Sequence, residues 1–193
     1  MFILKSRSPR RIQLLKDLDI HFQLEPSDIN ETQDQSEPPM DYLRRMVTSK
    51  LGDFRYLNPL NTYLSCDTIV LFENQILHKP SSEAEAMDIL ERLNGRTHSV
   101  FSASAMTDSI YFDYFYEETQ IRFHDWDTNA RLRYIREEKP YDKAGSYGVQ
   151  DRNGPVAERY GSYCNVLGFP LRSFLERWQS WIHYWPAWEK VKI

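Results

Sequence analysis

Hydrophobic and polar positions follow two different periods along the chain, which predicts a fold with both strands and helices. A short apolar run at residues 2–4 predicts a first strand. After it, apolar side chains recur three or four positions apart, at Ile12, Leu14, Leu15 and Leu18. Ser8 is a typical N-cap and Pro9 suits the first helical turn. We therefore predict a strand, a turn and a helix at the start of the chain.

The middle of the chain shows a polar loop, two more helices and a strand. Residues 25–39 are polar, acidic and proline-bearing, so we expect an exposed loop. A helix should follow, with an inner face made by Leu43, Met46, Val47 and Leu51. Residues 63–72 are dense in β-forming side chains and predict a strand. Ser82 and Glu85 form a capping box, which predicts the start of a helix that ends near Gly95.

The second half of the chain predicts more strands and two helices. Three strand-like segments have short connections that favour antiparallel neighbours, at residues 98–105, 110–116 and 119–123. Thr128 suits the cap of a short helix, residues 164–167 predict a final strand, and residues 171–185 predict an aromatic-rich helix. Elements in this order indicate an α/β fold around a mixed twisted sheet with flanking helices. We expect a single domain over residues 1–193.

Composition and charge narrow the classes of function. Hydrophobic residues make up 41% of the 193 residues and charged residues 27%, which is typical of a soluble globular protein. The net charge of −4 lacks the basic excess of a duplex-binding protein, so we expect no stable nucleic-acid complex. The first apolar run is too short for a signal peptide, and no stretch approaches the roughly 20 apolar residues of a membrane span. We expect a cytoplasmic protein with two reduced cysteines, Cys66 and Cys164.

Two adjacent arginines stand in the first turn of the first predicted helix. Positive charge there opposes the helix dipole, at a cost of roughly 0.3–1 kcal/mol for each side chain. Arg10 and Arg11 become favourable once an anion binds the free N–H groups of the helix, and a triphosphate is the obvious candidate. The alternative is that both side chains are solvated or pair with the acidic loop.

An aspartate lies in the middle of an otherwise apolar strand. Asp67 needs a partner there, because burying a lone carboxylate is costly. A divalent cation would be a suitable partner, and a second carboxylate such as Glu31 from the acidic loop could bind the same cation. The alternative is an aspartate at a strand end that contacts only the backbone. Lys79 is a further candidate to reach a phosphate, although a lysine before a proline carries little information by itself.

Residues 142–150 form a polar loop with two glycines, which permit the backbone to approach a ligand closely. Asp142 and Lys143 bring opposite charges, and the Gln150 amide both donates and accepts, which suits a base edge. The loop matches neither a Walker sequence nor a dinucleotide fingerprint. A purely structural loop is the alternative. The five histidines show no metal-ligand spacing.

Taken together, these segments resemble the Maf family of nucleotide pyrophosphatases over nearly the whole chain. The similar segments are residues 6–11, Glu31, the helix ending at Lys50, Asp67 with Thr68, Lys79 with Pro80, and residues 93–100, 142–150 and 161–171. The resemblance implies an α/β fold with two lobes around a cleft, similar to ITPase folds, and a homodimer. It also implies hydrolysis of a nucleoside triphosphate between its α and β phosphates, with Mg²⁺ or Mn²⁺ as cofactor.

The resemblance also assigns roles position by position. Asp67 would be the general base that takes a proton from the attacking water, and Glu31 would hold the metal with it. Arg10, Arg11 and Lys79 would hold the triphosphate and neutralise charge on the leaving pyrophosphate. The positions that resemble substrate-binding and specificity residues are Ser8, Arg10, Lys50, Thr68, Asp142, Lys143 and Gln150.

The same resemblance indicates the nucleotide. The subgroup with a loop like residues 142–150 prefers dTTP and UTP, whereas a sister subgroup that acts on 7-methyl-GTP has a different loop. The chain departs from the family pattern at Lys5, Cys66, Ser102 and Asp151. None of these departures removes a proposed catalytic group. Asp151 would place an extra negative charge beside the loop, which leaves the exact nucleotide open. The alternatives are 7-methyl-GTP and a modified pyrimidine triphosphate such as 5-methyl-UTP.

Two functions of other classes stay open on the sequence. A non-catalytic nucleotide-binding regulator of septum formation would use the same cleft, although it has no need of a general base. A globular domain that interacts through its aromatic C-terminal segment would bind no triphosphate.

Overall fold

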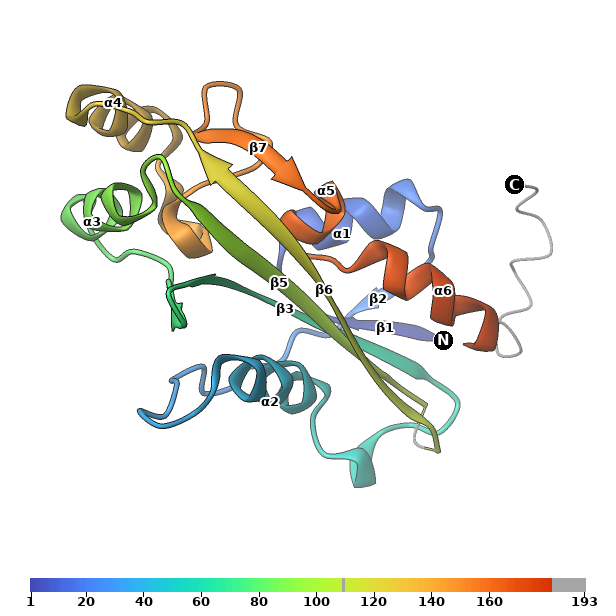
Figure 1. Ribbon diagram of the computed structural model, residues 1–193. Helices are drawn as coiled ribbons and strands as arrows, with labels where there is room; N and C mark the ends of the chain where they lie inside the picture. The colour runs from blue at the N-terminus through green and yellow to red at the C-terminus, as the bar shows by residue number, and fades with distance from the viewer. Residues whose placement is uncertain (109, 182–193) are drawn as a thin grey trace.

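The computed structural model describes residues 1–108 and 110–181 and shows one mixed sheet with helices on both faces (Figure 1). The strands are β1 (Phe2–Lys5), β2 (Gln23–Leu24), β3 (Thr62–Phe72), β4 (Gln75–Ile76), β5 (Thr97–Thr107), β6 (Phe112–Phe123) and β7 (Val156–Tyr160). Their order is β2-β1-β3-β5-β6-β7, with β4 beside β3. β1 is parallel to β2 and β3, and the other pairs are antiparallel. The predicted α/β fold around a mixed sheet is confirmed.

The helices are α1 (Pro9–Asp17), α2 (Pro39–Leu51), α3 (Glu83–Leu93), α4 (Thr128–Glu138), α5 (Tyr163–Val166) and α6 (Leu171–Trp181). Three short 3₁₀ turns accompany them, η1 (Phe54–Tyr56), η2 (Pro140–Asp142) and η3 (Ala144–Ser146). α1 begins as predicted, with Ser8 at the N-cap position, and the Ser82 hydroxyl caps α3 by accepting from the Glu85 N–H. No helix in the two described ranges is long and apolar enough to cross a membrane.

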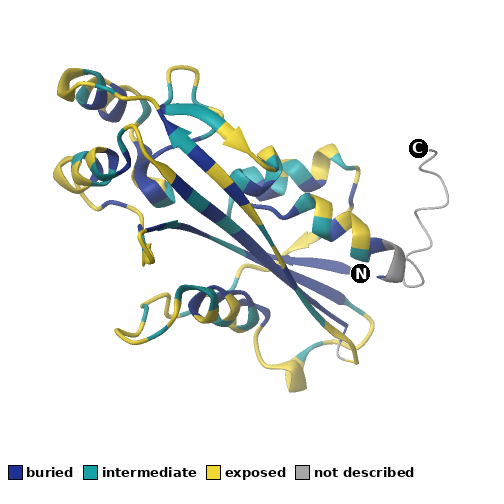
Figure 2. Cartoon of the chain, viewed as in Figure 1, coloured by how far each residue is buried: buried dark blue, intermediate teal, exposed yellow. Residues whose placement is uncertain are grey.

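Apolar side chains hold the helices on the sheet in three clusters. On one face, α2 buries Leu43, Met46 and Val47 against the sheet. On the other face, α1 and α6 pack with Leu15 and Phe174 in a second cluster. Figure 2 shows the buried positions along the strands, including a third cluster that α3 and α4 cover at one end of the sheet. Burying each such large side chain contributes about 1.5–3 kcal/mol, so packing rather than local propensity fixes these helices.

A gap in the sheet beside β3 positions the site. β1 ends at Lys5, opposite Ser65, whereas β3 continues to Phe72 and pairs with β4 only at its end. Among the described strands, none pairs with the intervening part of this edge of β3, which contains Asp67 and Thr68. Successive side chains of a strand point to opposite faces, so Asp67 meets α2 while Thr68 meets α1.

One predicted strand is wrong. Residues 164–167 belong to the short helix α5 and the turn after it, and the Ser162 hydroxyl caps this helix by accepting from the Asn165 N–H. A short apolar run cannot distinguish a buried helical turn from a strand. The last strand is instead β7, which pairs with only one neighbour, β6, and leaves its residues half-buried or exposed. Such an edge strand lacks a strong hydrophobic pattern.

Two further boundaries differ from the prediction. The strands expected at residues 110–116 and 119–123 are one continuous strand, β6, because the residues between them stay paired with β5. α4 is capped by Asp127, whose Oδ1 accepts a backbone N–H of the first turn, and not by Thr128. Residues 182–185 of the last predicted helix lie outside the described residues.

Candidate active site

A cleft of about 620 Å³ opens along the unpaired edge of β3. Its walls come from the β1–α1 turn, the acidic loop before α2, the segment after β4, the loop after α4 and the turn after α5. Every residue that was predicted for the site lines this cleft: Ser8, Arg10, Arg11, Glu31, Lys50, Asp67, Thr68, Lys79, Asp142, Lys143 and Gln150. The fold therefore brings together side chains from distant parts of the chain.

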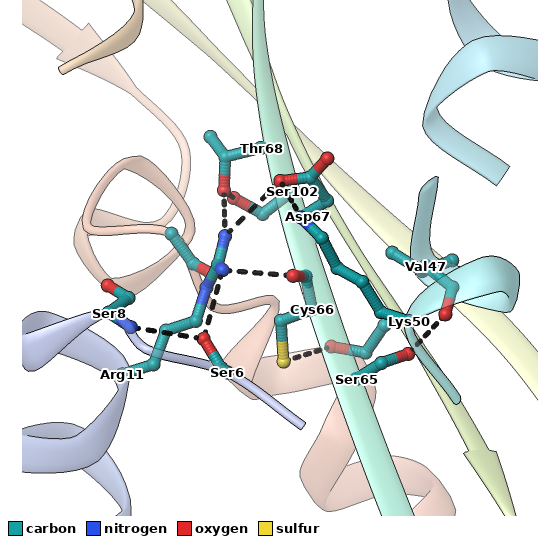
Figure 3. Close-up of polar contacts among 12 residues, drawn as sticks. Ser6, Ser8, Arg11, Val47, Lys50, Ser65, Cys66, Asp67, Thr68 and Ser102 are labelled. Carbon is teal, nitrogen blue, oxygen red and sulfur yellow. Dashed lines mark hydrogen bonds and ion pairs between the residues drawn. The ribbon is translucent and has the colours of Figure 1, made fainter. Parts of the chain in front are cut away.

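Lys50 joins the two carboxylates that were predicted to hold a metal. Its Nζ lies 2.9 Å from Glu31 Oε1 and 3.1 Å from Asp67 Oδ1 (Figure 3 shows the Asp67 contact). Lys50 stands in the last turn of α2, where the helix dipole favours a cation. Burial raises the pKa of Glu31, but the hydrogen bond and charge of Lys50 outweigh it, with help from Lys79 and Arg11, and hold that pKa below its ordinary value. The two carboxylates thus converge on one cation.

Arg11 is buried against the edge of β3 and is hydrogen-bonded in several directions (Figure 3). Its acceptors are the carbonyl oxygen of Gly168 at 2.7 Å, the carbonyl oxygen of Cys66 at 2.9 Å, Thr68 Oγ1 at 3.0 Å and Ser6 Oγ at 3.3 Å. All four acceptors are neutral. The charged partner of the guanidinium is Asp67, whose Oδ1 lies 4.0 Å from Nη2. Arg11 therefore ties the β1–α1 turn, β3 and the turn after α5 together at the base of the cleft.

The Thr68 hydroxyl connects Arg11 to β5. Thr68 Oγ1 lies 2.8 Å from Ser102 Oγ, which donates to the carbonyl oxygen of Asn165 at 2.6 Å. The Asn165 side chain accepts from the Ser102 N–H and donates to the carbonyl oxygen of Val100, so it is fixed in turn. Neither Ser102 nor Asn165 was among the residues predicted for the site. The available signal was a serine inside an apolar strand, because a buried hydroxyl needs a partner.

An ion pair crosses the mouth of the cleft. Arg10 Nη1 lies 3.1 Å from Asp142 Oδ2, and Lys143 Nζ lies 3.3 Å from the other oxygen of that carboxylate. Burial raises the pKa of Asp142, but the charge of Lys143 and the hydrogen bond from Arg10 outweigh it and lower the pKa overall. The pair links the start of α1 to the loop after α4. The alternative that Arg10 pairs with the acidic loop at residues 25–39 is wrong, because its carboxylate partner is Asp142.

Apolar side chains line the part of the cleft beyond Thr68, next to the polar residues of the loop after α4. The apolar lining includes Val70, Val100, Ala144, Tyr147, Val166 and Leu167. The loop reaches β3 through Gly145, which has a φ of +69° and where a Cβ would lie 2.9 Å from Val70 Cγ1. The Tyr147 hydroxyl is 2.8 Å from His98 Nε2, and burial lowers the pKa of His98 to about 3. The imidazole is therefore neutral at physiological pH and is structural, as expected for the histidines.

Asp151 was expected to place its charge beside the ligand, but its side chain does not line the cleft. Its Oδ2 accepts from the Tyr134 hydroxyl at 2.5 Å and from the Gly148 N–H at 2.9 Å, and Asp151 is not part of the cleft lining. The Asp151 carboxylate thus stabilises the turn at residues 148–151. A Cβ at residue 148 would lie 2.5 Å from Asp151 Oδ1, so any larger residue there would displace the Asp151 carboxylate. The Asp151 carboxylate is therefore hydrogen-bonded within the protein by Tyr134 and Gly148 and does not add negative charge to the cleft lining.

The described ranges hold no group of three or more His, Cys, Asp and Glu side chains that could bind a metal unaided. A metal in this cleft would thus rest on Glu31, Asp67 and oxygens of the ligand. Cys66 and Cys164 are free cysteines. Cys66 is fully buried, its Sγ accepts from the Ser104 hydroxyl, and burial raises the pKa of its thiol. It packs beneath the cleft as a small buried residue, as expected.

Comparisons with known proteins agree with the motif resemblance. The "dTTP/UTP pyrophosphatase" of Leptospira biflexa is 52% identical over 185 residues, which are 96% of each chain. The protein of the same name from Leptospira interrogans is 44% identical over 95% of this chain and 97% of its own. That of Bacillus cereus is 35% identical over 88% and 89%.

Among solved structures, the Staphylococcus aureus Ham1 protein matches with a TM-score of 0.46 and 15% identity, over 64% of this chain and 72% of that chain. The family described as "Maf-like protein" matches residues 1–180, which covers every residue of the cleft. This chain belongs to the Maf-like protein family.

Proposed function

We propose that this chain is a nucleoside triphosphate pyrophosphatase that hydrolyses dTTP and UTP to the monophosphate and pyrophosphate. The observation that carries the proposal is the division of the cleft at the edge of β3. Charged side chains gather on the Asp67 side and at the helix start, and apolar side chains gather beyond Thr68. A nucleoside triphosphate has the same division between its phosphates and its base. The relatives at 44–52% identity carry the name dTTP/UTP pyrophosphatase.

The proposed reaction starts at Asp67. Its carboxylate takes a proton from a water molecule as the water oxygen attacks the α-phosphorus, and the bond from that phosphorus to the bridging oxygen breaks to release pyrophosphate. Arg10, Arg11 and Lys79 supply positive charge for the phosphates, together with the N-terminus of α1. Asp67 suits the base because it is the carboxylate on the unpaired edge of β3, where a phosphate can approach.

A divalent cation, Mg²⁺ or Mn²⁺, suits the two carboxylates of the cleft. Glu31 and Asp67 already share one positive charge, the Lys50 ammonium, at 2.9 and 3.1 Å. Mg²⁺ is commonly bound by one or two carboxylates together with substrate phosphates, which matches this donor set. When bound, such an ion supplies charge neutralisation and lowers the pKa of water. Glu31 and Asp67 would hold it, and Lys50 would keep the two carboxylates in place.

The loop after α4 suits a pyrimidine base. The Tyr147 ring and the neighbouring valines offer an apolar surface for a base, and Gln150 lies at the same wall of the cleft. Uracil and thymine present an N–H donor between two carbonyl acceptors, and a glutamine amide can both accept from and donate to that edge. Ser8, Thr68, Asp142 and Lys143 complete the proposed substrate-binding set. A nucleotide of this class needs neither a membrane nor a nucleic acid as partner.

We also infer a homodimer that acts in the cytoplasm, as the family resemblance implies. Sedimentation velocity at micromolar concentration checks the dimer. A monomer under conditions of full activity would contradict it.

The proposed function is tested by product analysis with a panel of triphosphates. Purified protein is mixed with dTTP, UTP, dCTP, dGTP, 5-methyl-UTP or 7-methyl-GTP in the presence of Mg²⁺ or Mn²⁺, and pyrophosphate and phosphate are measured separately. We expect pyrophosphate and the monophosphate, fastest from dTTP and UTP. Binding of these nucleotides without any release would instead support a non-catalytic regulator. Fastest turnover of 7-methyl-GTP would overturn the pyrimidine assignment.

A further inference from the structure

The hydrogen bonds of Arg11 leave it very little capacity for a ligand. A guanidinium carries five N–H groups. Four of them donate hydrogen bonds to acceptors of the protein, which belong to Gly168, Cys66, Ser6 and Thr68. One N–H of Nη2 finds no hydrogen-bond acceptor in the described residues, and Nη2 lies 4.0 Å from Asp67 Oδ1, beyond hydrogen-bond distance. Arg11 can therefore make one contact with a ligand, from the nitrogen beside Asp67.

The direction of each hydrogen bond behind this nitrogen is determined. Arg11 only donates, so Thr68 Oγ1 accepts from it at 3.0 Å. The backbone carbonyl oxygen of Asn165 only accepts, so the Ser102 hydroxyl donates its one hydrogen bond to that oxygen, at 2.6 Å. The contact of 2.8 Å between Thr68 and Ser102 must then be a donation from Thr68. Arg11, Thr68, Ser102 and Asn165 form one chain in which every donor points toward Asn165.

This chain has consequences for Thr68 and for Arg11. The Thr68 proton is committed to Ser102, so Thr68 cannot donate a hydrogen bond to a phosphate oxygen. The chain also holds Nη2 from behind, and bonds aligned in one direction polarise one another. Ser102 and Asn165 are completely buried, so water does not compete for these bonds. The unused N–H of Arg11 is thereby fixed next to the carboxylate that serves as base.

We propose that Arg11 binds the α-phosphate through this single N–H, and that Ser102 and Asn165 are positioning residues that hold it there through Thr68. The inference rests on the proposed function, because the α-phosphorus is the atom that water attacks beside Asp67. It moves Arg11 from the leaving pyrophosphate to the reacting phosphoryl group. Arg10 and Lys79 then remain the cations for the β and γ phosphates.

The test compares two serines of the same strand. Ser102 and Ser104 lie on one face of β5 and both are completely buried, but Ser104 bonds to Cys66 Sγ and is outside the chain of hydrogen bonds. Titration calorimetry with Mg²⁺ present measures the binding of dTMP, which carries the α-phosphate, and of inorganic pyrophosphate. We expect Ser102→Ala to weaken dTMP binding about tenfold and to leave pyrophosphate binding within about twofold. Ser104→Ala should change neither, and Ser102→Thr, which keeps the hydroxyl, should restore dTMP binding.

Equal effects of Ser102→Ala and Ser104→Ala, or an equal loss of dTMP and pyrophosphate binding in Ser102→Ala, would overturn the proposal. If Ser102→Ala does not fold, Thr68→Val answers the same question, since it keeps the shape of the side chain and removes the hydroxyl. The binding arms need no turnover. A wild-type protein that binds dTMP with this dependence on Ser102 but releases no pyrophosphate would contradict the proposed function and leave the Arg11 assignment standing.

Discussion

The two faces of β3 at the cleft differ in how they hold their functional side chains. On the α2 face, Asp67 meets charged partners, with Lys50 at 3.1 Å and, through it, Glu31. On the opposite face, the Thr68 hydroxyl accepts from the buried guanidinium of Arg11 and donates to Ser102. Two neighbouring residues of one strand therefore belong to different kinds of site.

The difference has a physical consequence for each face. Charged contacts at the half-open α2 face can exchange one cation for another, which suits binding of a metal and phosphates. The buried hydrogen bonds of Arg11, Thr68 and Ser102 cannot be broken without leaving a polar group unpaired, so they keep the opposite face rigid. We conclude that the α2 face supplies reactive charge, whereas the Thr68 face supplies a frame. The following predictions test this difference, starting with the largest effect.

Asp67→Asn should lower the rate of pyrophosphate release by a factor on the order of 10³, because the amide cannot take a proton and holds a cation poorly. Thr68→Val, on the other face, should lower the rate by only about tenfold, since it disturbs the frame and keeps the base. Steady-state kinetics with dTTP measures both, with circular dichroism to show that each variant is folded. An Asp67→Asn protein with the wild-type rate would remove the assignment of the base.

Gly168→Ala should disturb the frame directly, at Thr68 and at the Arg11 guanidinium. Gly168 has a φ of +109°, and a Cβ there would lie 3.2 Å from Thr68 Oγ1 and 3.4 Å from Arg11 Nε. We expect the free energy of unfolding to fall by about 1–3 kcal/mol, together with a loss of turnover. Gly52→Ala is the matched control, because Gly52 has a φ of +89° with nothing within 4 Å of the added Cβ. Urea unfolding should show a loss in both variants, but only Gly168→Ala should slow turnover.

The pH dependence of the free energy of unfolding tests whether the buried His98 side chain, on the Thr68 face of the sheet, is uncharged in the folded protein. Burial lowers the pKa of His98 from 6.5 to about 3, so between these values the unfolded chain binds a proton that the folded chain does not. Stability from this group is therefore complete above pH 6.5 and falls as the pH is lowered toward 3. We expect the free energy of unfolding to be about 2 kcal/mol smaller at pH 5 than at pH 7 on account of His98.

His98→Gln isolates that contribution, because a glutamine can still form a hydrogen bond with the Tyr147 hydroxyl in either direction and does not titrate. Urea unfolding at pH 5, 6 and 7 should show a weaker pH dependence for the variant than for the wild type. Identical slopes would mean that the imidazole is protonated in the folded protein.

The same contrast explains how much the sequence could predict. Asp67 in an apolar strand and Arg10 in a first helical turn are unusual where they stand, so residue type and the family resemblance predicted their place in the cleft. Three other charged residues of the lining were not predicted: Lys5, Arg7 and Asp28. The frame was not predictable, because a serine and an asparagine become informative only when the register places Ser102 opposite Thr68 and the turn after α5 beside both.

The fold followed the same rule. Long segments with a clear period, such as β3 and α3, were predicted within one or two residues. The errors fell on α5 and β7, a four-residue helix and an exposed edge strand, whose conformations depend on tertiary contacts. A cap such as Asp127 in place of Thr128 depends on a single hydrogen bond, which neighbouring candidates satisfy equally well in sequence.

Arg10→Ala should produce the smallest effect, since the Arg10–Asp142 pair lies at the solvent-exposed mouth of the cleft, with side chains 30% and 63% exposed. A phosphate must compete with Asp142 for Arg10, and solvent screens both interactions. We expect the KM for dTTP to rise about fivefold at 50 mM NaCl, with little change in kcat, and the difference to shrink at about 500 mM NaCl. Arg136→Ala is the control, because it removes an exposed arginine of α4 that pairs with Glu83 of α3, and it should leave KM unchanged at both salt concentrations. A larger loss in kcat than in KM would place Arg10 at the reacting phosphoryl group and would blur the distinction between the two arginines of the first turn.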